Sequence, residues 1–288
     1  MFHVEQFVRM SIEKSNFITK DYFKSQEKFE LVWDEAYQIF KTQPQPDAKE
    51  IGKYYDSEAY ISHSNQIKNL MDLAYGVAKQ LMLKKKLNWV NSLVKKKASI
   101  LDIGCGTGDV LWLLQKNKFE VQGIEPNAKA RKIAQEKDLQ IHADLQEVKD
   151  TFDLISMFHV LEHVHDPFSY VEDLHQYLNS DAYVMVAVPN FNSYDANYYQ
   201  EHWAAFDVPR HLFHFSAYGI KKLFQERGFL FIEQKPLILD AYYVSLLSEK
   251  YKGSNSKLKA LQVAWKSNSL ARTSNEWSSH LYVFKKAK

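Results

Sequence analysis

Short apolar runs alternate with longer amphipathic stretches over residues 98–235. The runs have the length of buried strands, and the stretches between them are long enough for helices. Strand-helix-strand alternation predicts parallel strands joined by right-handed crossovers, with helices on both faces of the sheet. The expected strands are residues 98–103, 119–124, 139–142, 152–157, 182–188 and 229–233, and residues 281–284 offer a seventh.

The rest of the chain has weaker patterns. Apolar residues recur every three or four positions from Ile67 to Leu81 and predict a helix. A second helix, residues 216–227, is expected to end at Gly228, where a left-handed cap costs nothing. We expect an N-terminal appendage (1–63), a helical lead-in (64–97) and a main domain (98–288) with a helix-like, polar insertion at about 240–279.

Composition narrows the class of protein. With 37 Lys and Arg against 35 Asp and Glu, the chain gives no electrostatic reason to expect a nucleic-acid partner. The first residues lack the pattern of a secretory signal, and no run is long enough for stable insertion across a bilayer. The single cysteine, Cys105, excludes an intramolecular disulfide and fits a reducing compartment. We therefore expect a cytoplasmic globular protein, with the oligomeric state left open.

A glycine-rich turn carries the candidate chemistry. It follows the strand ending at Ile103 and reads Gly104-Cys105-Gly106-Thr107-Gly108. Such a turn lies at the carboxyl edge of a parallel sheet, where ligands bind. We expect Gly104 and Gly106 to let the backbone approach a ligand, and Gly108 to let the next helix pack tightly.

A nicotinamide-binding turn is the nearest alternative, because glycine turns also seat pyrophosphates. The spacing here is G-x-G-x-G, and the carboxylates of Asp102 and Asp109 flank it. Carboxylates repel a pyrophosphate, whereas S-adenosylmethionine has no phosphate and carries a sulfonium and an ammonium. The acidic setting therefore favours S-adenosylmethionine over NAD.

The stretch from Ile100 to Gly108 resembles the first motif of class I S-adenosylmethionine-dependent methyltransferases. The resemblance implies a Rossmann-like three-layer α/β sandwich, with a mostly parallel seven-stranded sheet, an antiparallel last strand and an N-terminal helical addition. Glu125, about twenty residues after the glycines, is positioned to accept both ribose hydroxyls. The resemblance also assigns Asp144 to the adenine amino group. The expected cofactor-binding residues are Asp102, Gly104, Cys105, Gly106, Gly108, Glu125, Pro126, Asp144, Leu145 and Phe158.

Two later segments resemble ubiquinone-biosynthesis and related small-molecule methyltransferases. They are residues 158–167, which contain Leu161-Glu162-His163, and residues 207–216. The sequence His159-Val160-Leu161-Glu162-His163 also matches H-x-x-E-H, an inverted zinc-peptidase pattern. Because the run before it reads as a strand and not a helix, we do not expect a zinc-peptidase site there. The resemblance also implies a divalent ion near this segment in some relatives, but His159 stands where an acidic residue is expected, so we predict no metal site. His159, His163 and His211 are candidate general bases, each with loop packing or helix capping as the alternative role.

An aromatic acceptor pocket is expected in the connection after the fifth strand of the main domain. The residues that would line it are Tyr199, Trp203, Arg210 and His214, with packing of a long loop as the alternative. The predicted reaction is in-line methyl transfer to O, N or C of a small-molecule or lipid-linked acceptor. A non-catalytic S-adenosylmethionine-binding protein and an NAD-dependent oxidoreductase remain the alternatives.

Overall fold

The computed structural model describes residues 14–55 and 70–287, with the backbone alone for residues 70–75. These residues form two compact units, each built from separate stretches of chain. The first unit contains residues 14–45, 189–217 and 236–280. The second unit contains residues 46–55, 70–188, 218–235 and 281–287. The chain after residue 14 forms strands and not helices. The sequence gives no sign that these strands group with residues 189–217.

The second unit is built on a seven-stranded sheet with the order β10-β11-β8-β7-β4-β5-β6. Strand β4 is an interior strand and pairs in parallel with β5 and β7, as alternation predicted. The core strands are apolar on both faces, which is expected for a sheet covered by helices on each side. The strands are β4 (Ser99–Ile103), β5 (Glu120–Ile124), β6 (Gln140–His142), β7 (Phe152–Phe158), β8 (Leu178–Pro189), β10 (Phe229–Pro236) and β11 (Ser279–Lys286).

The last strand is antiparallel to its neighbours, as expected. The backbone N–H of Ala287 donates to the carbonyl of Gly228, so the end of β11 meets the start of β10. The Lys286 ammonium donates to the carbonyl of Leu178, which places the same end beside the start of β8. Gly228, with φ +75°, follows α6 in the left-handed conformation that the sequence predicted.

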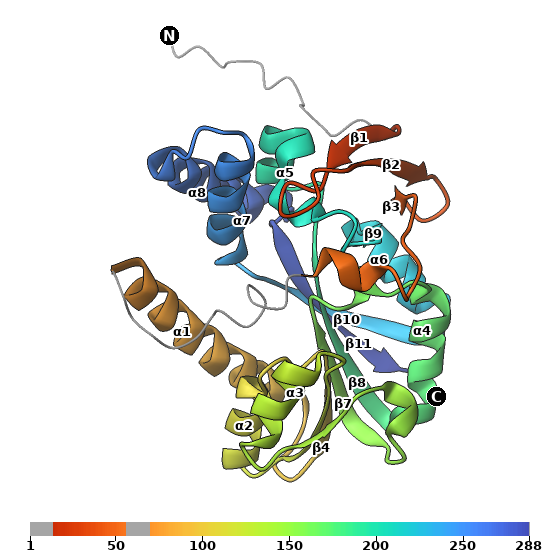
Figure 1. Cartoon of the computed structure of the whole chain (residues 1–288). Coiled ribbons are helices and arrows are strands. Elements are labelled where there is room, and N and C mark those ends of the chain that lie inside the picture. The colour runs from red at the N-terminus through yellow and green to blue at the C-terminus, as the bar shows by residue number, and fades with distance from the viewer. Residues whose placement is uncertain (1–13, 56–69, 288) are drawn as a thin grey trace. The chain divides into compact units, whose positions relative to one another are not determined.

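Helices cover both faces of this sheet. In Figure 1, α1, α2 and α3 lie on one side of the strands and α4 and α6 on the other. The predicted lead-in helix is real but extends well past Leu81. The helices are α1 (Leu70–Leu93), α2 (Asp109–Lys116), α3 (Ala128–Gln135), α4 (Pro167–Asp173) and α6 (Ala217–Gln225). The resulting three-layer α/β arrangement confirms the predicted fold class.

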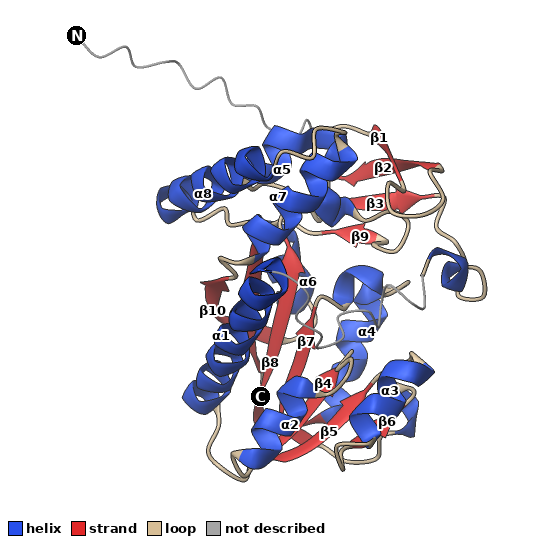
Figure 2. Cartoon of the chain, turned by 60° about the vertical axis from the view of Figure 1, so that its left-hand side comes forward, coloured by secondary structure: helices blue, strands red, loops and turns tan. Residues whose placement is uncertain are grey.

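The first unit joins a small antiparallel sheet to a helical group. Its strands run in the order β1-β2-β3-β9, and Figure 2 shows β9 beside β3 although about 170 residues separate them in sequence. The strands are β1 (Phe17–Lys20), β2 (Lys28–Asp34), β3 (Ile39–Gln43) and β9 (Phe213–His214). The helices are α5 (Tyr194–Tyr199), α7 (Asp240–Tyr251) and α8 (Lys257–Ser274), so the 240–279 segment is helical as expected.

A buried carboxylate connects the helical group. Asp195 of α5 is fully buried and accepts hydrogen bonds from Trp203 Nε1 at 2.8 Å, Ser267 Oγ at 2.6 Å and Ser278 Oγ at 2.7 Å. Those donors come from the loop after α5, from α8 and from the segment leading into β11. Because a buried charge is tolerated only when it is hydrogen-bonded, Asp195 holds these segments together.

Candidate cofactor site

The glycine turn connects β4 to α2 and is fixed by backbone hydrogen bonds to the next strand. The N–H groups of Gly104 and Cys105 both donate to the carbonyl of Ile124, at 2.8 and 3.0 Å. Gly104, Gly106 and Gly108 have φ values of +70°, +56° and +75°. Residues with a Cβ rarely adopt this region, so the path of the turn requires all three glycines.

The space around each glycine gives it a separate role. A Cβ on Gly108 would lie 2.7 Å from Leu139 Cδ1 and 2.9 Å from Ala134 Cβ, so this glycine lets α2 pack tightly, as predicted. A Cβ on Gly104 would lie 2.5 Å from Val160 Cγ2, so protein packing already fills the space beside Gly104. A Cβ on Gly106 would meet nothing within 4 Å. Of the two glycines expected to admit a ligand, only Gly106 opens onto unfilled space.

Asp102, the second-last residue of β4, is a buried carboxylate directly before the turn. Its Oδ1 accepts a hydrogen bond from Ser156 Oγ at 2.6 Å, and Ser156 is its partner across the β4–β7 ladder. Burial raises the pKa of Asp102 to about 6, with a smaller contribution from Glu125, although Lys86 and Ser156 oppose the rise. The Asp102 carboxylate is therefore poorly stabilised by the protein alone, and a cationic ligand would stabilise its ionised form.

Glu125, directly after β5, is buried and joined to the turn by backbone hydrogen bonds. One carboxylate oxygen accepts the N–H of Gly106 at 2.8 Å, and the other accepts the N–H of Asn127 at 2.8 Å. Burial raises the pKa of Glu125 despite these bonds and the nearby Arg131. Each oxygen has a second lone pair, so the carboxylate has the capacity to accept two ligand hydroxyls as well.

Asp109 does not contribute free negative charge to the turn, contrary to the argument from sequence. Its carboxylate forms ion pairs with Lys79 at 2.6 Å and Lys137 at 2.5 Å. Burial favours a higher pKa for Asp109, but these two lysines outweigh it and hold the pKa below its usual value. The acidic character of the site therefore comes from Asp102 and Glu125.

Two predicted adenine contacts follow β6. Asp144 is exposed, and its side chain accepts the N–H of Gln146, which caps a short 3-10 turn, while Leu145 is buried.

Phe158, at the end of β7, is partly buried with the Lys86 ammonium 3.5 Å from its ring centroid. Lys86, which the sequence did not single out, contacts Phe158 and lowers the pKa of Asp102. The lysine was missed because its neighbours Lys84 and Lys85 make the run look like an exposed face.

The Cys105 side chain is part of the protein core and does not face a ligand. It packs in an apolar cluster with Leu111, Ala134, Leu139 and Ile141. Burial raises its pKa far above that of a free thiol, so Cys105 is unreactive. Its predicted cofactor role is therefore limited to the backbone. Pro126 is another expected cofactor-binding residue, and its carbonyl accepts a hydrogen bond from Arg131 Nη1 at 2.9 Å.

The segment after β7 has the wrong geometry for a zinc-peptidase helix. His159 has φ +57°, and Leu161–His163 form a single 3-10 turn, η3. His159 Nδ1 lies 3.3 Å from Glu162 Oε1, and His163 Nδ1 lies 3.1 Å from the hydroxyl of Tyr55. The two histidines therefore do not share the helical face that the H-x-x-E-H mechanism needs. Tyr55 was not predicted to contact His163, because it is separated from it by more than 100 residues.

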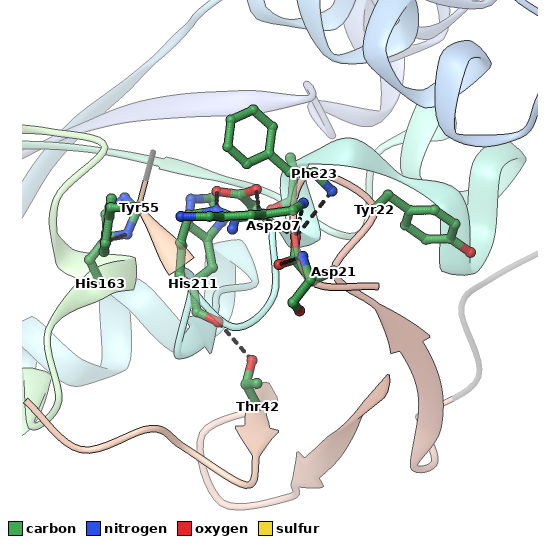
Figure 3. A network of polar contacts seen from close by, with 12 residues as sticks. Asp21, Tyr22, Phe23, Thr42, Tyr55, His163, Asp207 and His211 are labelled. Carbon is green, nitrogen blue, oxygen red and sulfur yellow. Dashed lines mark hydrogen bonds and ion pairs between the residues drawn. The ribbon is translucent and has the colours of Figure 1, made fainter. Parts of the chain in front are cut away.

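In the first unit, hydrogen bonds fix the proton positions of two histidines. His211 Nδ1 lies 2.8 Å from the carbonyl of Ala205, which can only accept, so Nδ1 carries a proton, and in the neutral ring Nε2 carries the lone pair. The Thr42 hydroxyl donates to the carbonyl of His211 at 2.7 Å (Figure 3). Since its one hydrogen is used there, it accepts from His214 Nε2 at 3.0 Å. Burial, and secondarily His211, holds the pKa of His214 well below its usual value.

The remaining expected pocket residues are tied into the first unit. Arg210 is buried between Asp207 and Asp21, at 2.7 and 2.9 Å (Figure 3 labels both carboxylates). Tyr199 is buried with its hydroxyl donating to Glu249 at 3.2 Å, and Trp203 donates to Asp195. These contacts favour packing of the loop, the alternative left open by the sequence, for Arg210, Tyr199 and Trp203.

Comparison with known proteins adds family information. The family described as "Methyltransferase domain" matches residues 79–234. The chain is 26% identical over 121 residues to a ubiquinone biosynthesis O-methyltransferase of Paracidovorax citrulli, covering 38% of this chain and 51% of that protein. It is 31% identical over 111 residues to an uncharacterized methyltransferase of Alkaliphilus oremlandii, covering 34% and 49%. The chain thus spans about half the length of these curated relatives.

A solved structure with the same fold is that of the magnesium protoporphyrin IX methyltransferase of Synechocystis with bound S-adenosylhomocysteine. It superposes with a TM-score of 0.57 over 84% of this chain and all of that one, at 13% sequence identity. At this identity the likeness concerns the fold alone. In the part of the chain that the structure describes, no helix is long and apolar enough to cross a membrane.

Proposed function

Because this chain belongs to the methyltransferase-domain family, we propose that it is an S-adenosylmethionine-dependent methyltransferase that acts on a small-molecule or lipid-linked acceptor. One observation carries the proposal. The turn after β4 presents Gly106 to open space while Asp102 and Glu125, both buried, end the two adjacent strands. This combination suits a nucleoside that has no phosphate and carries positive charge.

The described residues fit such a cofactor. The Glu125 carboxylate would accept the ribose hydroxyls, and Asp102 would favour the ammonium through its ionised form. Leu145 and the Phe158 ring would pack against the adenine, and Asp144 would accept from its amino group. When bound, S-adenosylmethionine supplies an electrophilic methyl group, so the protein's main task is to orient the acceptor for in-line attack.

His211 has the tautomer that a general base needs. Its Nδ1–H bond to Ala205 fixes the ring and leaves the lone pair on Nε2. We assign Nε2 the removal of the proton from an acceptor hydroxyl as the methyl group is transferred, or from an acceptor ammonium before its nitrogen attacks. His214, in contrast, donates from Nε2 and serves to hold Thr42. His159 Nδ1 faces the Glu162 carboxylate, which accepts, so a neutral His159 also keeps its lone pair on Nε2 and stays a candidate, although its contact is longer, at 3.3 Å. His163 is a candidate of lower rank, since the Tyr55 hydroxyl at its Nδ1 leaves its tautomer open.

Two measurements test this function. Calorimetry of the purified chain should show binding of S-adenosylhomocysteine and no binding of NAD; the reverse result would make the chain an oxidoreductase. Incubation with cofactor labelled in the methyl group and a cell extract should then yield a labelled product. Binding without any labelled product across varied extracts would identify the chain as a non-catalytic S-adenosylmethionine-binding protein.

A further inference from the structure

Helix α8 exposes large apolar side chains that its own unit does not need for packing. Leu258, Leu261 and Trp265 are 68%, 47% and 66% exposed. At about 100° per residue they fall within an arc of about 60° on the helix. The opposite face is buried and consists of small or short residues: Ala260, Val263, Ala264, Ser267, Asn268 and Ala271. Among the described residues, the core of the first unit therefore does not use the exposed stripe.

The same region concentrates positive charge. Residues 250–275 contain six cationic side chains and no acidic one, whereas the whole chain has a net charge of only +2. All six are exposed: Lys250, Lys252, Lys257, Lys259, Lys266 and Arg272. We call these six residues, together with Leu258, Leu261 and Trp265, the α8 surface.

Aromatic residues of α5 hold some of these cations in place. The ammonium groups of Lys252 and Lys259 lie 5.1 and 5.4 Å from the ring centroid of Tyr198, and that of Lys266 lies 5.0 Å from Tyr194. These cation–π contacts favour positions of the three ammonium groups beside the rings of α5. Tyrosine and tryptophan beside lysine are also typical of groups placed at a membrane-water interface.

We propose that the α8 surface binds the face of an anionic lipid bilayer, with α8 lying in the plane of the interface. An apolar stripe bordered by cations would insert Leu258, Leu261 and Trp265 between acyl chains while the lysines contact the headgroups. A nucleic acid would neutralise the cations but leave the leucines in water. A second copy would set six positive charges against six in a two-fold contact. The proposal does not depend on methyl transfer.

Cosedimentation of the full chain with vesicles tests the proposal without any cofactor. The chain should bind vesicles that contain phosphatidylglycerol and should bind pure phosphatidylcholine far less. The Leu258→Ser/Trp265→Ser variant should lower the partition coefficient more than about tenfold, since it removes two apolar side chains that would be buried in the bilayer. The Lys257→Gln/Arg272→Gln variant should lower it about fivefold for each charge removed.

The matched control is Trp112→Ser, which removes another exposed tryptophan, 43% accessible, from α2. It should bind vesicles like the unchanged chain, and circular dichroism should show all variants folded. Equal binding to neutral and anionic vesicles, or unchanged binding by Leu258→Ser/Trp265→Ser, would overturn the proposal. The proposal would also be overturned if the chain did not bind vesicles but formed a Trp265-dependent dimer, or a Trp265-dependent complex with transfer RNA or an acidic protein.

Discussion

The three glycines of the turn after β4 share a positive φ but differ in what surrounds them. Protein atoms occupy the space beside Gly104 and Gly108, and the space beside Gly106 is open. A substitution at Gly104 or Gly108 therefore acts mainly on folding. A substitution at Gly106 strains the backbone and also places a methyl group where the cofactor is proposed to lie.

We expect Gly104→Ala and Gly106→Ala to fail in different ways. Gly106→Ala should cost about 1–2 kcal/mol of stability from its left-handed φ and should abolish measurable S-adenosylhomocysteine binding. Gly104→Ala should destabilise the fold further, because its methyl group meets Val160 at 2.5 Å. Thermal unfolding and calorimetry would separate the two effects. The Gly104→Ala/Val160→Ala variant should recover part of the stability; no recovery would mean that Val160 is not the obstacle.

Asp102 makes stability depend on pH in a predictable direction. Its pKa is about 6 in the folded chain against 3.8 as the reference, so the folded state binds the proton more tightly. Folding stability is therefore highest below pH 3.8 for this group and falls as the pH rises through 6. The free energy of unfolding of Asp102→Asn, relative to the unchanged chain, should increase by about 2 kcal/mol from pH 4 to pH 7.

Urea unfolding of both chains at several pH values would measure this difference. A constant difference across that range would show that Asp102 is not destabilised by burial. Asp102→Asn should also bind S-adenosylhomocysteine more weakly at pH 8, where the native carboxylate is ionised. Greater stability together with weaker binding is the combination expected of a residue kept for its ligand.

Glu125→Ala tests the ribose contact. The variant should weaken S-adenosylhomocysteine binding by about 1.5–3 kcal/mol, the range for a hydrogen bond to a charged group. Because Glu125 also accepts the N–H groups of Gly106 and Asn127, part of any loss could come from the turn itself. Adenine, which lacks the ribose, is the control ligand: its affinity should change little. An equal loss for both ligands would mean that the turn has collapsed.

At the scale of elements, Asp195 connects helices and loops that are far apart in sequence. Asp195→Ala leaves the hydrogen-bond donors of Trp203, Ser267 and Ser278 buried without an acceptor, at about 1–3 kcal/mol for each. We expect a loss of at least about 3 kcal/mol in the free energy of unfolding. Ser278→Ala, which removes one donor and keeps the acceptor, should cost about 1 kcal/mol. Similar losses for both variants would contradict a central role for Asp195.

An element could be predicted from the sequence when the residues that determine it lie within the element itself. Strands β4, β5 and β7 are short runs that contain buried apolar residues, and Gly228 has the signature of a helix cap, so these features could be predicted from the sequence. The first unit could not, because its sheet pairs Phe40 with His214 and Lys41 with Phe213 across more than 170 residues. Its strands are short and mixed in polarity, and nothing local reports their pairing.

The same distinction separates the predicted site residues that the structure brings together from those that it does not. Asp102, Gly106 and Glu125 lie at strand ends whose order follows from parallel crossovers, so their grouping was predictable. Ser156 was missed because its hydrogen bond to Asp102 depends on strand register. Lys86 was missed because its electrostatic effect on Asp102 depends on the rotation of α1. Arg210 was predicted to line the pocket for the methyl acceptor. It instead pairs with Asp21, which lies 189 residues away and could not be identified as its partner from the sequence.

At the scale of the whole molecule, turnover requires loss of a proton from the acceptor, and this separates His211 from His214. With saturating cofactor and the acceptor recovered from extract, kcat of the unchanged chain should fall in acid as His211 Nε2 becomes protonated. His211→Gln should lower kcat by about 10²–10⁴-fold and remove that acid limb, while S-adenosylhomocysteine affinity stays constant. Keeping cofactor saturating excludes the separate effect of Asp102, which acts on cofactor binding. His214→Gln should instead lower the melting temperature and leave the shape of the pH profile unchanged. If the decrease of kcat in acid persists in His211→Gln, a group other than His211 removes the proton from the acceptor.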